Sequence, residues 1–583
     1  MRIFLDLMWY FKTRKAEYLG GIMMLVLVAL LGLIPPRIVG IFVDSINHHT
    51  LTHKMLWTWL FTILAIALSM YVFRYLWRIL LFGSAIHLST LIRKQLYEHF
   101  TSMSPQFFHE RRIGDLMAHA TNDISAIEST ATDGILTLVD SITTGGLVVI
   151  TMAVTINWQL TLVALLPMPI MAYATSKYGT ILHKRFIKAQ AAFSDMNDKV
   201  QENISGVRAI KAFGQEDSEI QSFAILSKDL VEKNIAVAKI DALFDPTIAL
   251  IVGLSYFLSF AFGSVLVIHH RLTIGDLTAF SIYLGQLIWP MLAFGFLFNV
   301  VERGSASYDR VRKLMAVPPV IIDRPNATDI VPSGDVTFKI NSFKYPSAVS
   351  PTLTDIEVTV KQGTTLGIVG KTGSGKTTLL RLLMREFDID DGDITIGIHS
   401  IYEVKRNALR KAIAYVPQEH FLFSTTIAEN IAFGNPDSTL HEIENAAKLA
   451  SVHKDILQFE AGYATMVGER GVTLSGGQKQ RLSIARALLL DSEILILDDS
   501  LSAVDSKTET QILTSLMENQ KDRTTIISTH RLSAVAHADI IIVLDNGRII
   551  ERGTHGQLIN QDGWYASIYR NQQIESLVEQ GGE

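Results

Sequence analysis

Long uncharged segments dominate the chain before about residue 304. Five of them contain no Asp, Glu, Lys or Arg: Tyr18–Pro36, Met55–Phe73, Ser141–Ser176, Pro246–His270 and Leu277–Val301. About 20 apolar residues let a helix cross the hydrocarbon core of a bilayer, and five such runs exceed what the buried helices of a soluble protein need. The longest run is interrupted by Asn157-Trp158-Gln159, which predicts parts of two helices joined by a tight turn. The pattern therefore predicts six transmembrane helices.

Lys and Arg are distributed unevenly between the loops. They are frequent in residues 86–133 and 177–244, whereas the opposite loops hold only Arg37, Lys54 and Arg271. Because positive charge marks cytoplasmic loops, we expect a multi-pass protein of the cell membrane with both termini in the cytoplasm. Residues 1–15 have apolar positions at helical spacing and predict an amphipathic helix on the inner membrane surface. No small-residue cleavage site follows the first apolar run, which argues against a signal peptide.

From about Val336 the pattern changes to short β-branched runs that alternate with helical stretches. The runs are Thr365–Val369, Ala412–Val416, Ile494–Leu497, Thr524–Ser528 and Ile540–Leu544. This alternation predicts an α/β domain with a largely parallel sheet. We expect a membrane domain over residues 1–317, a linker over 318–334 and the α/β domain over 335–583.

Composition narrows the class of protein. Of the 583 residues, 48% are hydrophobic and 19% are charged, and the mean hydropathy is +0.27. These values exclude a disordered chain and a small disulfide scaffold. The net charge of −5 gives no basic field for nucleic acid, and the absence of cysteine excludes thiolate metal sites and a Cys nucleophile. We therefore expect no nucleic-acid partner.

A P-loop pattern opens the α/β domain. Its residues are Gly370, Lys371, Thr372, Gly373, Ser374, Gly375, Lys376 and Thr377, and a helix follows from Thr378. The glycines let backbone N–H groups surround phosphates at a helix N-terminus. Lys376 then reaches the β- and γ-phosphates, and Thr377 offers its hydroxyl to Mg²⁺. The pattern predicts binding of ATP and Mg²⁺ by these residues and Thr378.

An apolar strand that ends in carboxylates provides the second part of the site. Ile494–Leu497 precedes Asp498, which is placed to hold Mg²⁺ directly or through water. Asp499 follows, where a carboxylate can polarise the attacking water. The fold class is thus a membrane α-helical domain with six transmembrane helices, followed by an α/β P-loop nucleotide-binding domain.

The pentapeptide Leu474-Ser475-Gly476-Gly477-Gln478 resembles the signature of ABC-transporter ATPases. Further motifs of that family have counterparts in the same order. Tyr345 resembles the aromatic residue that stacks on adenine, and Gln418 resembles the Q-loop glutamine. Gly468–Gly471 resembles the X-loop, Ser502–Asp505 resembles the D-loop, and His530 resembles the switch histidine. The resemblance covers the whole chain, and six helices before the nucleotide domain are similar to a half-transporter of the exporter type.

The resemblance implies how the site is completed. In this family Ser475, Gly476, Gly477 and Gln478 face an ATP that lies on the P-loop of a second subunit, so the working unit is a dimer. The resemblance also implies that Gln418 joins Thr377 and Asp498 near Mg²⁺, and that His530 touches the γ-phosphate. The loop breaks near residues 107–122 and 203–216 resemble the family's coupling helices.

The strand Ile494–Leu497 with Asp498 resembles the Walker B motif of the family. Asp499 departs from the family pattern, which usually has Glu after the Walker B Asp. Its carboxylate is one methylene shorter, and a displacement of about 1 Å in a positioned group can lower a rate about a hundredfold. We expect a weak or absent catalytic base, although small backbone shifts offer an alternative in which Asp499 still reaches. An intact signature beside a weak site resembles heterodimeric bacterial multidrug exporters. The alternatives are a homodimeric lipid flippase and a regulatory subunit without transport of its own.

The transported substrate is poorly encoded. Aromatic residues are frequent in the last two membrane helices: Tyr256, Phe257, Phe260, Phe262, Phe280, Tyr283, Trp289, Phe294, Phe296 and Phe298. These aromatic rings could bind small hydrophobic or cationic drugs. Alternatively they face membrane lipid or pack between helices, which we expect for at least half of these residues. Asp140 is a candidate because carboxylates within the membrane are costly.

Overall fold

The computed structural model describes residues 2–346, 348–468, 474–502, 504–519 and 523–581. It divides into two compact units. The first consists of Met1–Ser102 and Phe108–Pro318, and the second of Met103–Phe107 and Pro319–Glu583. Each unit is described separately below.

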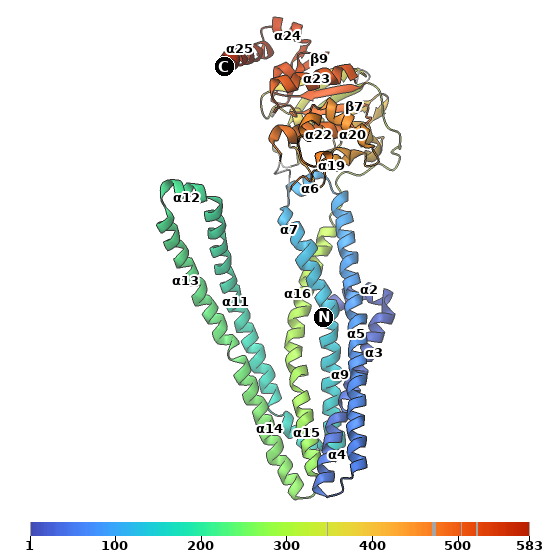
Figure 1. Cartoon of the computed structure of the whole chain (residues 1–583), viewed down its shortest axis with the longest axis vertical. Helices are drawn as coiled ribbons and strands as arrows, with labels where there is room; N and C mark the ends of the chain where they lie inside the picture. Colours follow the sequence, from blue (N-terminus) through green and yellow to red (C-terminus); the bar gives the residue numbers. More distant parts are fainter. Residues whose placement is uncertain (1, 347, 469–473, 503, 520–522, 582–583) are drawn as a thin grey trace. The chain divides into compact units, whose positions relative to one another are not determined.

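The first unit is built from long helices joined by short turns (Figure 1). Up to the first break they are α1 (Arg2–Asp6), α2 (Met8–Thr13), α3 (Lys15–Gly32), α4 (Ile34–Asn47) and α5 (His53–Ser102). Helix α6 (Pro105–His109) begins in the segment Met103–Phe107, which belongs to the second unit. The next are α7 (Ile113–Ala118), η1 (His119–Asp123), α8 (Ile124–Ser129), η2 (Thr130–Gly134), α9 (Ile135–Thr151), η3 (Met152–Asn157) and α10 (Trp158–Leu165). The last are α11 (Met168–Ser205), α12 (Val207–Phe213), α13 (Glu216–Asp241), α14 (Phe244–Ile268), α15 (Ile274–Gln286) and α16 (Ile288–Met315).

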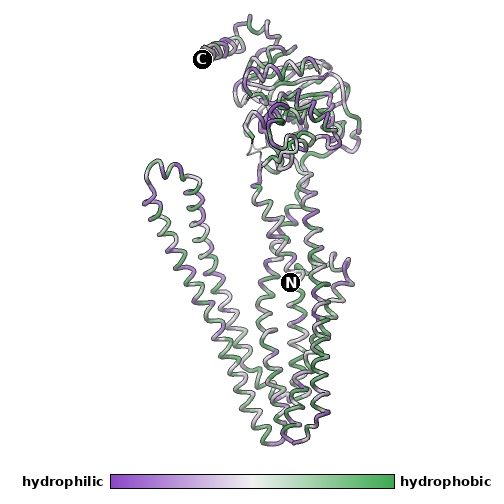
Figure 2. The backbone as a smooth tube through the Cα atoms, viewed as in Figure 1, coloured by the Kyte–Doolittle hydropathy of each residue, from purple (hydrophilic) through white to green (hydrophobic). Residues whose placement is uncertain are grey.

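Within the described residues, five helices are long and apolar enough to cross a membrane, by length and composition alone. They are Lys15–Asn47, His53–Ser102, Ile113–Leu165, Glu216–Ile268 and Ile274–Met315, and apolar residues run along them in Figure 2. The sixth predicted helix is divided between α10 and α11 by a turn before Met168. Pro167 in this turn has no N–H to donate, which interrupts the helix. The predicted reversal is also present, since Asn157 is extended and caps α10 by accepting the N–H of Leu160.

The two loop breaks differ in how well their positions were predicted. The second agrees with expectation, because α12 lies between Ser205 and Glu216. The first was expected near residues 107–122, and the chain is non-helical there at residues 110–112; an interruption that was not predicted lies at residues 103–104, between α5 and α6. Pro105 accounts for this additional interruption, because the residue before a proline is driven out of helical geometry.

The N-terminal segment, predicted as an amphipathic helix on the inner membrane surface, forms α1 and α2. Its apolar residues Ile3, Leu7 and Tyr10 are buried in the helical unit, and the Tyr10 hydroxyl donates to the Ser84 carbonyl oxygen at 2.6 Å. Trp9 is left exposed on the other side. Leu5 and Met8 are exposed as well, so only part of the apolar side chains of this segment packs inside the protein.

Two helices of the first unit approach backbone to backbone. A Cβ atom on Gly275 of α15 would lie 2.0 Å from the carbonyl oxygen of Gly40 on α4. Asp44 closes the contact by accepting the Gly275 N–H at 2.7 Å and the Thr273 hydroxyl at 2.6 Å. Arg37 pairs with Asp276 at 2.6 Å. Glycine at these positions is a steric requirement of the α4–α15 contact.

The second unit contains two sheets. The four-stranded sheet has the order β2-β1-β4-β5 and the six-stranded sheet has the order β10-β9-β3-β8-β7-β6. The first five strands are β1 (Val336–Phe343), β2 (Leu353–Val360), β3 (Thr365–Gly370), β4 (Asp391–Ile396) and β5 (His399–Ser400). The others are β6 (Ile413–Val416), β7 (Ile494–Asp498), β8 (Thr524–Ser528), β9 (Ile540–Asp545) and β10 (Arg548–Gly553).

Pairing in the larger sheet is parallel from β9 to β6, and only β10 runs antiparallel. Each predicted β-branched run thus lies in one parallel sheet. Successive residues of β3 enter opposite cores, with Ile368 in one cluster and Val369 in the other. This burial on both faces explains why the strands are apolar at nearly every position. The carboxyl ends of β3, β6 and β7 consequently meet at one edge of the sheet.

Helices and short 3₁₀ turns complete the second unit. The helices are α17 (Lys376–Leu383), α18 (Arg406–Lys411), α19 (Ile427–Ile431), α20 (Leu440–Leu449), α21 (His453–Ile456), α22 (Gly476–Leu488), α23 (Ser506–Asn519), α24 (His555–Asn560) and α25 (Trp564–Gly581). The 3₁₀ turns are η4 (Ala432–Gly434), η5 (Gly462–Ala464) and η7 (Leu532–Val535). The predicted P-loop lies between β3 and α17, and the signature opens α22.

Candidate nucleotide-binding site

The P-loop has the backbone that its glycines predict. Gly370, Gly373 and Gly375 have φ values of 149°, 80° and 104°, a region that favours glycine. At Gly370 a Cβ atom would also lie 2.1 Å from the Leu544 carbonyl oxygen. Lys376 donates its ammonium protons to the carbonyl oxygens of Gly370 and Lys371 at 2.8 and 3.0 Å. The cationic group thus lies over the loop that is predicted to hold phosphate.

A buried carboxylate lies at the end of β7, opposite the start of α17. The Thr377 hydroxyl donates to Asp498 Oδ1 at 3.1 Å, and the Tyr415 hydroxyl donates to Oδ2 at 3.3 Å. Burial raises the pKa of Asp498, and these two hydrogen bonds oppose the shift. Mg²⁺ prefers hard oxygen ligands, so the Thr377 hydroxyl and the Asp498 carboxylate fit this ion. Tyr415 was not predicted as a site residue. Its position on the strand that leads to Gln418 was the one feature of the sequence that could have identified it.

Asp499, His530 and Gln418, the three predicted catalytic residues, are brought together. His530 Nδ1 lies 2.8 Å from Asp499 Oδ1, and the Gln418 amide nitrogen lies 3.5 Å from Asp499 Oδ2. The Asp499 side chain is 17% exposed and that of His530 is 56% exposed. The carboxylate is therefore the shielded member of the pair, and the imidazole is the one accessible to solvent.

The backbone at Asp499 is unusual for a residue with a side chain. Its φ is 47°, in the left-handed region where a non-glycine residue is strained. The Asp499 N–H donates to the Ser528 carbonyl oxygen at 2.7 Å and extends the β7–β8 pairing by one residue. This backbone turns the carboxylate out of the strand direction and toward His530.

Two more titratable groups, Lys376 and His420, lie near Asp499. Burial lowers the pKa of Lys376, and the carboxylates of Asp499 and Asp498 oppose that shift. Burial likewise lowers the pKa of His420, with Asp499 again opposing it. His420 was not singled out from the sequence, where its neighbour Gln418 carried the motif. Asp499 therefore lies among one lysine and two histidines.

Tyr345, predicted to stack on adenine, lies at the side of the P-loop helix. Its hydroxyl donates to the Thr378 hydroxyl at 3.0 Å, which gives Thr378 a partner within the site. Its ring makes edge contacts with Phe343 and Phe387 at centroid distances of 5.1 and 5.0 Å. The ring orientation is thus fixed from both sides.

The signature residues form the N-terminus of α22. Ser475 is the N-cap, its hydroxyl accepts the Gln478 N–H, and Gln478 accepts the Ser475 N–H at 3.0 Å. Gln478 thus stabilises the start of α22 through a reciprocal capping box with Ser475. Leu474 is buried, whereas Ser475 and Gly476 are exposed. The predicted X-loop residues Glu469, Arg470 and Gly471, and Ala503 of the predicted D-loop, lie outside the described residues.

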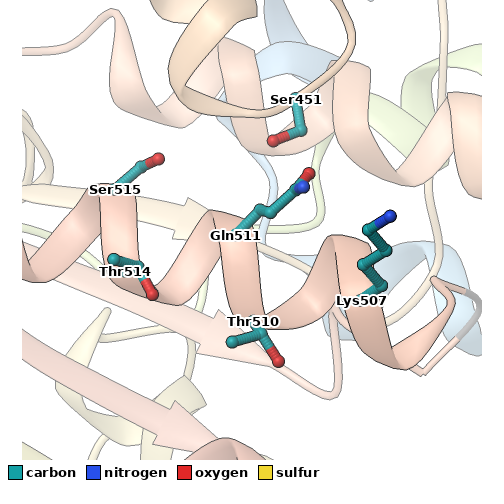
Figure 3. Close-up of a pocket in the computed structure, with 6 residues that line it drawn as sticks. All are labelled: Ser451, Lys507, Thr510, Gln511, Thr514 and Ser515. Carbon is teal, nitrogen blue, oxygen red and sulfur yellow. The ribbon is translucent and has the colours of Figure 1, made fainter.

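A separate hollow of about 600 Å³ is lined by Ser451, Lys507, Thr510, Gln511, Thr514 and Ser515. Figure 3 shows that five of these side chains come from α23. No P-loop, Walker B or signature residue lines it, so this hollow is not the nucleotide site.

Fold and site together define a P-loop ATPase that carries a helical membrane domain. Sequence models of the ABC transporter transmembrane region and of the ABC transporter nucleotide domain match residues 18–291 and 353–502. The chain belongs to the ABC transporter family, with an exporter-type transmembrane domain followed by an ABC nucleotide-binding domain. Its ATPase activity is coupled to transport.

Relatives span the full length of the chain. It is 48% identical to the multidrug resistance-like ATP-binding protein MdlA of Escherichia coli, covering 100% of this chain and 99% of that one. It is 45% identical to a probable multidrug resistance ABC transporter ATP-binding/permease protein, YheI of Bacillus subtilis, over 98% of both chains. It is 34% identical to the ATP-dependent lipid A-core flippase of Syntrophus aciditrophicus, covering 84% of this chain and 81% of that one.

A solved structure supports the same architecture. The structure of a bacterial Atm1-family ABC exporter with ATP bound superposes with a TM-score of 0.78 at 27% sequence identity. It covers 96% of this chain and 98% of the other. The chain is thus a multi-pass ABC exporter of the multidrug type, similar to MdlA and YheI.

Proposed function

We propose that the chain drives the efflux of hydrophobic or amphipathic drugs across the cell membrane as one half of a heterodimeric ABC exporter. The observation that carries this proposal is Asp499, whose short carboxylate stands where the family has Glu and is paired with His530 at 2.8 Å. The chain would supply a degenerate ATP site of its own and an intact signature to a competent site on its partner. This arrangement resembles the BmrC–BmrD pair.

In this proposal each part of the site has a defined task. The P-loop N–H groups and Lys376 hold the phosphates, and Tyr345 supports the adenine. Thr377, Asp498 and Gln418 hold Mg²⁺, which would neutralise charge on the phosphate oxygens. Asp499 and His530 orient the attacking water and contact the γ-phosphate. Because Asp499 is short and its carboxylate is bound to His530, we expect proton abstraction to be slow.

Exposed surfaces support a second half-transporter as partner. Helix α12 contains no buried residue, and Ile204 and Phe213 beside and within it are 69% and 78% exposed. Large apolar residues on a polar hairpin are typical of a surface that contacts another protein. Ser475 and Gly476 are also exposed, as a signature that serves another chain requires.

The candidate aromatic residues of the cavity divide into two groups. Phe280 and Tyr283 are fully buried core residues, and Tyr256 donates its hydroxyl to the Ser281 carbonyl oxygen. Among the exposed ones are Phe257, Trp289, Phe296 and Phe298. The exposed rings are the ones we propose for contact with drug or membrane lipid, while the buried rings pack between helices. The side chain of Phe294 lies outside the described residues.

Asp140 has a local partner, since it accepts the Thr144 hydroxyl at 2.8 Å. This hydrogen bond joins two residues one turn apart on the same helix and stabilises the carboxylate. Asp140 therefore remains a candidate for cationic drugs.

We propose residues 1–317 as the translocation domain, 318–334 as the linker and 335–583 as the nucleotide-binding domain. In this arrangement the nucleotide-binding domain and both termini lie in the cytoplasm. The positive charge of the long loops supports this orientation.

The experiment that tests the proposal is the composition of the complex recovered through a tag on this chain in its native membrane. A second, non-identical half-transporter at equal stoichiometry would support the heterodimer. A complex of about twice 64.8 kDa containing only this chain would overturn it. The relative named as a lipid A-core flippase makes a homodimeric lipid flippase the second candidate, and normal ATP turnover by the chain alone would favour it.

A further inference from the structure

The loop that carries His530 is held by a side chain 42 residues further along the chain. Gln572 lies on α25, and its amide nitrogen donates to the His530 carbonyl oxygen at 2.8 Å. The amide oxygen of the same side chain accepts the Leu532 N–H at 2.9 Å. One glutamine thus binds the backbone on both sides of Arg531. A side-chain amide is suited to this task because it donates and accepts at once.

Helix α25 is itself fixed at its start. Tyr565 is fully buried and its hydroxyl lies 2.7 Å from His555 Nδ1. The Trp564 N–H donates to a carboxylate oxygen of Glu551 at 2.6 Å. Gln572 follows Tyr565 by seven residues and therefore lies on the same face of the helix. The position of its amide is set by this packed first turn.

The opposite side of the loop is also tied down. The Arg531 guanidinium donates to the carbonyl oxygens of Ser502 and Val504 at 2.9 and 3.0 Å. It also pairs with the buried Glu509 at 3.1 Å. The backbone of residues 530–532 is therefore fixed by Arg531 on one side and by Gln572 on the other. The imidazole of His530 points to Asp499 from a loop that these two side chains support.

We propose that Gln572 is a positioning residue for His530, through which the C-terminal helix sets the rate of ATP hydrolysis. This inference rests on the proposed role of His530. Without the amide, the His530 carbonyl and the Leu532 N–H lose their partner, and the loop no longer presents the imidazole at one defined position. We expect ATP binding to be unchanged, because both hydrogen bonds described for Gln572 go to the backbone of the loop over residues 530–532.

The test compares Gln572→Ala and Gln572→Glu with the matched control Asn571→Ala in the full complex. Asn571 is the adjacent exposed residue on the same helix. We expect Gln572→Ala to lower kcat about fivefold to thirtyfold at unchanged KM for ATP, the loss given by one or two hydrogen bonds. Gln572→Glu keeps an acceptor for the Leu532 N–H but sets a carboxylate oxygen against the His530 carbonyl oxygen, so we expect a loss at least as large. An unchanged kcat in Gln572→Ala, or an equal loss in Asn571→Ala, would overturn the inference.

A second measurement separates positioning from general stability. In a His530→Ala background, Gln572→Ala should cause no further loss, because both changes act on the same group. A full additional loss would overturn the inference. Where a second half-transporter co-purifies, its P-loop lysine is replaced by alanine so that the residual hydrolysis belongs to this chain.

The His530→Ala variant also separates the proposed role of His530 from the proposed role of Gln572. If His530→Ala leaves hydrolysis at this site unchanged, the assignment of His530 in the proposed function is wrong, and the inference falls with it. If His530→Ala abolishes hydrolysis while Gln572→Ala leaves it intact, only the role of Gln572 is wrong. Hydrogen exchange of the Leu532 amide checks the contact directly, and we expect faster exchange in Gln572→Ala.

Discussion

Asp499 and His530 meet at 2.8 Å, between a carboxylate oxygen and the Nδ1 atom of the imidazole. Asp499 reaches this position from the end of β7 with a left-handed backbone, at φ 47°. The imidazole is the more exposed of the two, with 56% of the His530 side chain exposed against 17% for Asp499. The short Asp499 side chain thus lies against His530, and its carboxylate is paired with the imidazole.

The first prediction concerns the length of this carboxylate. Asp499→Glu adds one methylene and should raise ATP hydrolysis at this chain's site at least about tenfold, because the group then reaches the position of the attacking water. Asp499→Asn is the matched control and should abolish the residual activity. Steady-state ATPase of the assembled complex is the measurement, and equal turnover by the native chain and Asp499→Glu would show that Asp499 does not limit the site.

Most of the nucleotide site could be predicted from sequence because its parts are local. The glycines of the P-loop indicate where the backbone has positive φ. The strand–loop–helix order then places Lys376 and Thr377 without knowledge of the rest of the fold. The buried strands were apolar at nearly every position, which identified the parallel sheet.

Contacts between distant segments carried no comparable signal. Tyr415 binds Asp498 across 83 residues, and Gln572 binds the His530 loop across 42. Tyrosine and glutamine are common on strands and helices, so neither residue stood out. The interruption at residues 103–104, before Pro105, was not predicted, although the one at residues 110–112 lies within the predicted break.

The second prediction ranks two binding residues. If the signature serves the competent site of a partner, Ser475→Ala should lower the ATPase of the pair more than Lys376→Ala does. Ser475 also caps α22, and losing that cap costs about 1 kcal/mol, so Ser475→Asp is included to keep the cap while changing the group offered to phosphate. ATPase and thermal unfolding of each variant are measured together. The reverse ranking would contradict the assignment of the sites.

The third prediction concerns the close contact between α4 and α15. Gly275→Ala places a methyl group 2.0 Å from the Gly40 carbonyl oxygen, so the helices must separate. We expect a loss of about 1–3 kcal/mol, as for other overpacked interiors, seen as a lower unfolding temperature in detergent. Gly253→Ala on α14 is the control, because a Cβ there meets no atom within 4 Å. Equal unfolding temperatures for the two variants would contradict the contact.

The last prediction is a pH dependence at the start of α23. The N–H of Thr508 donates to Asp505 Oδ1 at 2.9 Å, and this hydrogen bond holds the pKa of Asp505 below its ordinary value. Since the pKa of Asp505 is lowered on folding, its stabilisation is complete above the ordinary carboxylate range and is lost as the pH falls through the folded-state value. We expect hydrogen exchange of the Thr508 amide, corrected for intrinsic rate, to lose protection only at acidic pH.

Two variants check this origin of the pH dependence. Asp505→Ala should lose the protection at every pH, while Asp505→Ser should retain part of it without the acid transition, because a hydroxyl caps a helix but does not titrate in this range. Lys507→Ala is the control on the same turn and should leave the acid transition in place. Protection that falls with pH in Asp505→Ser as it does in the native chain would assign the transition to another group.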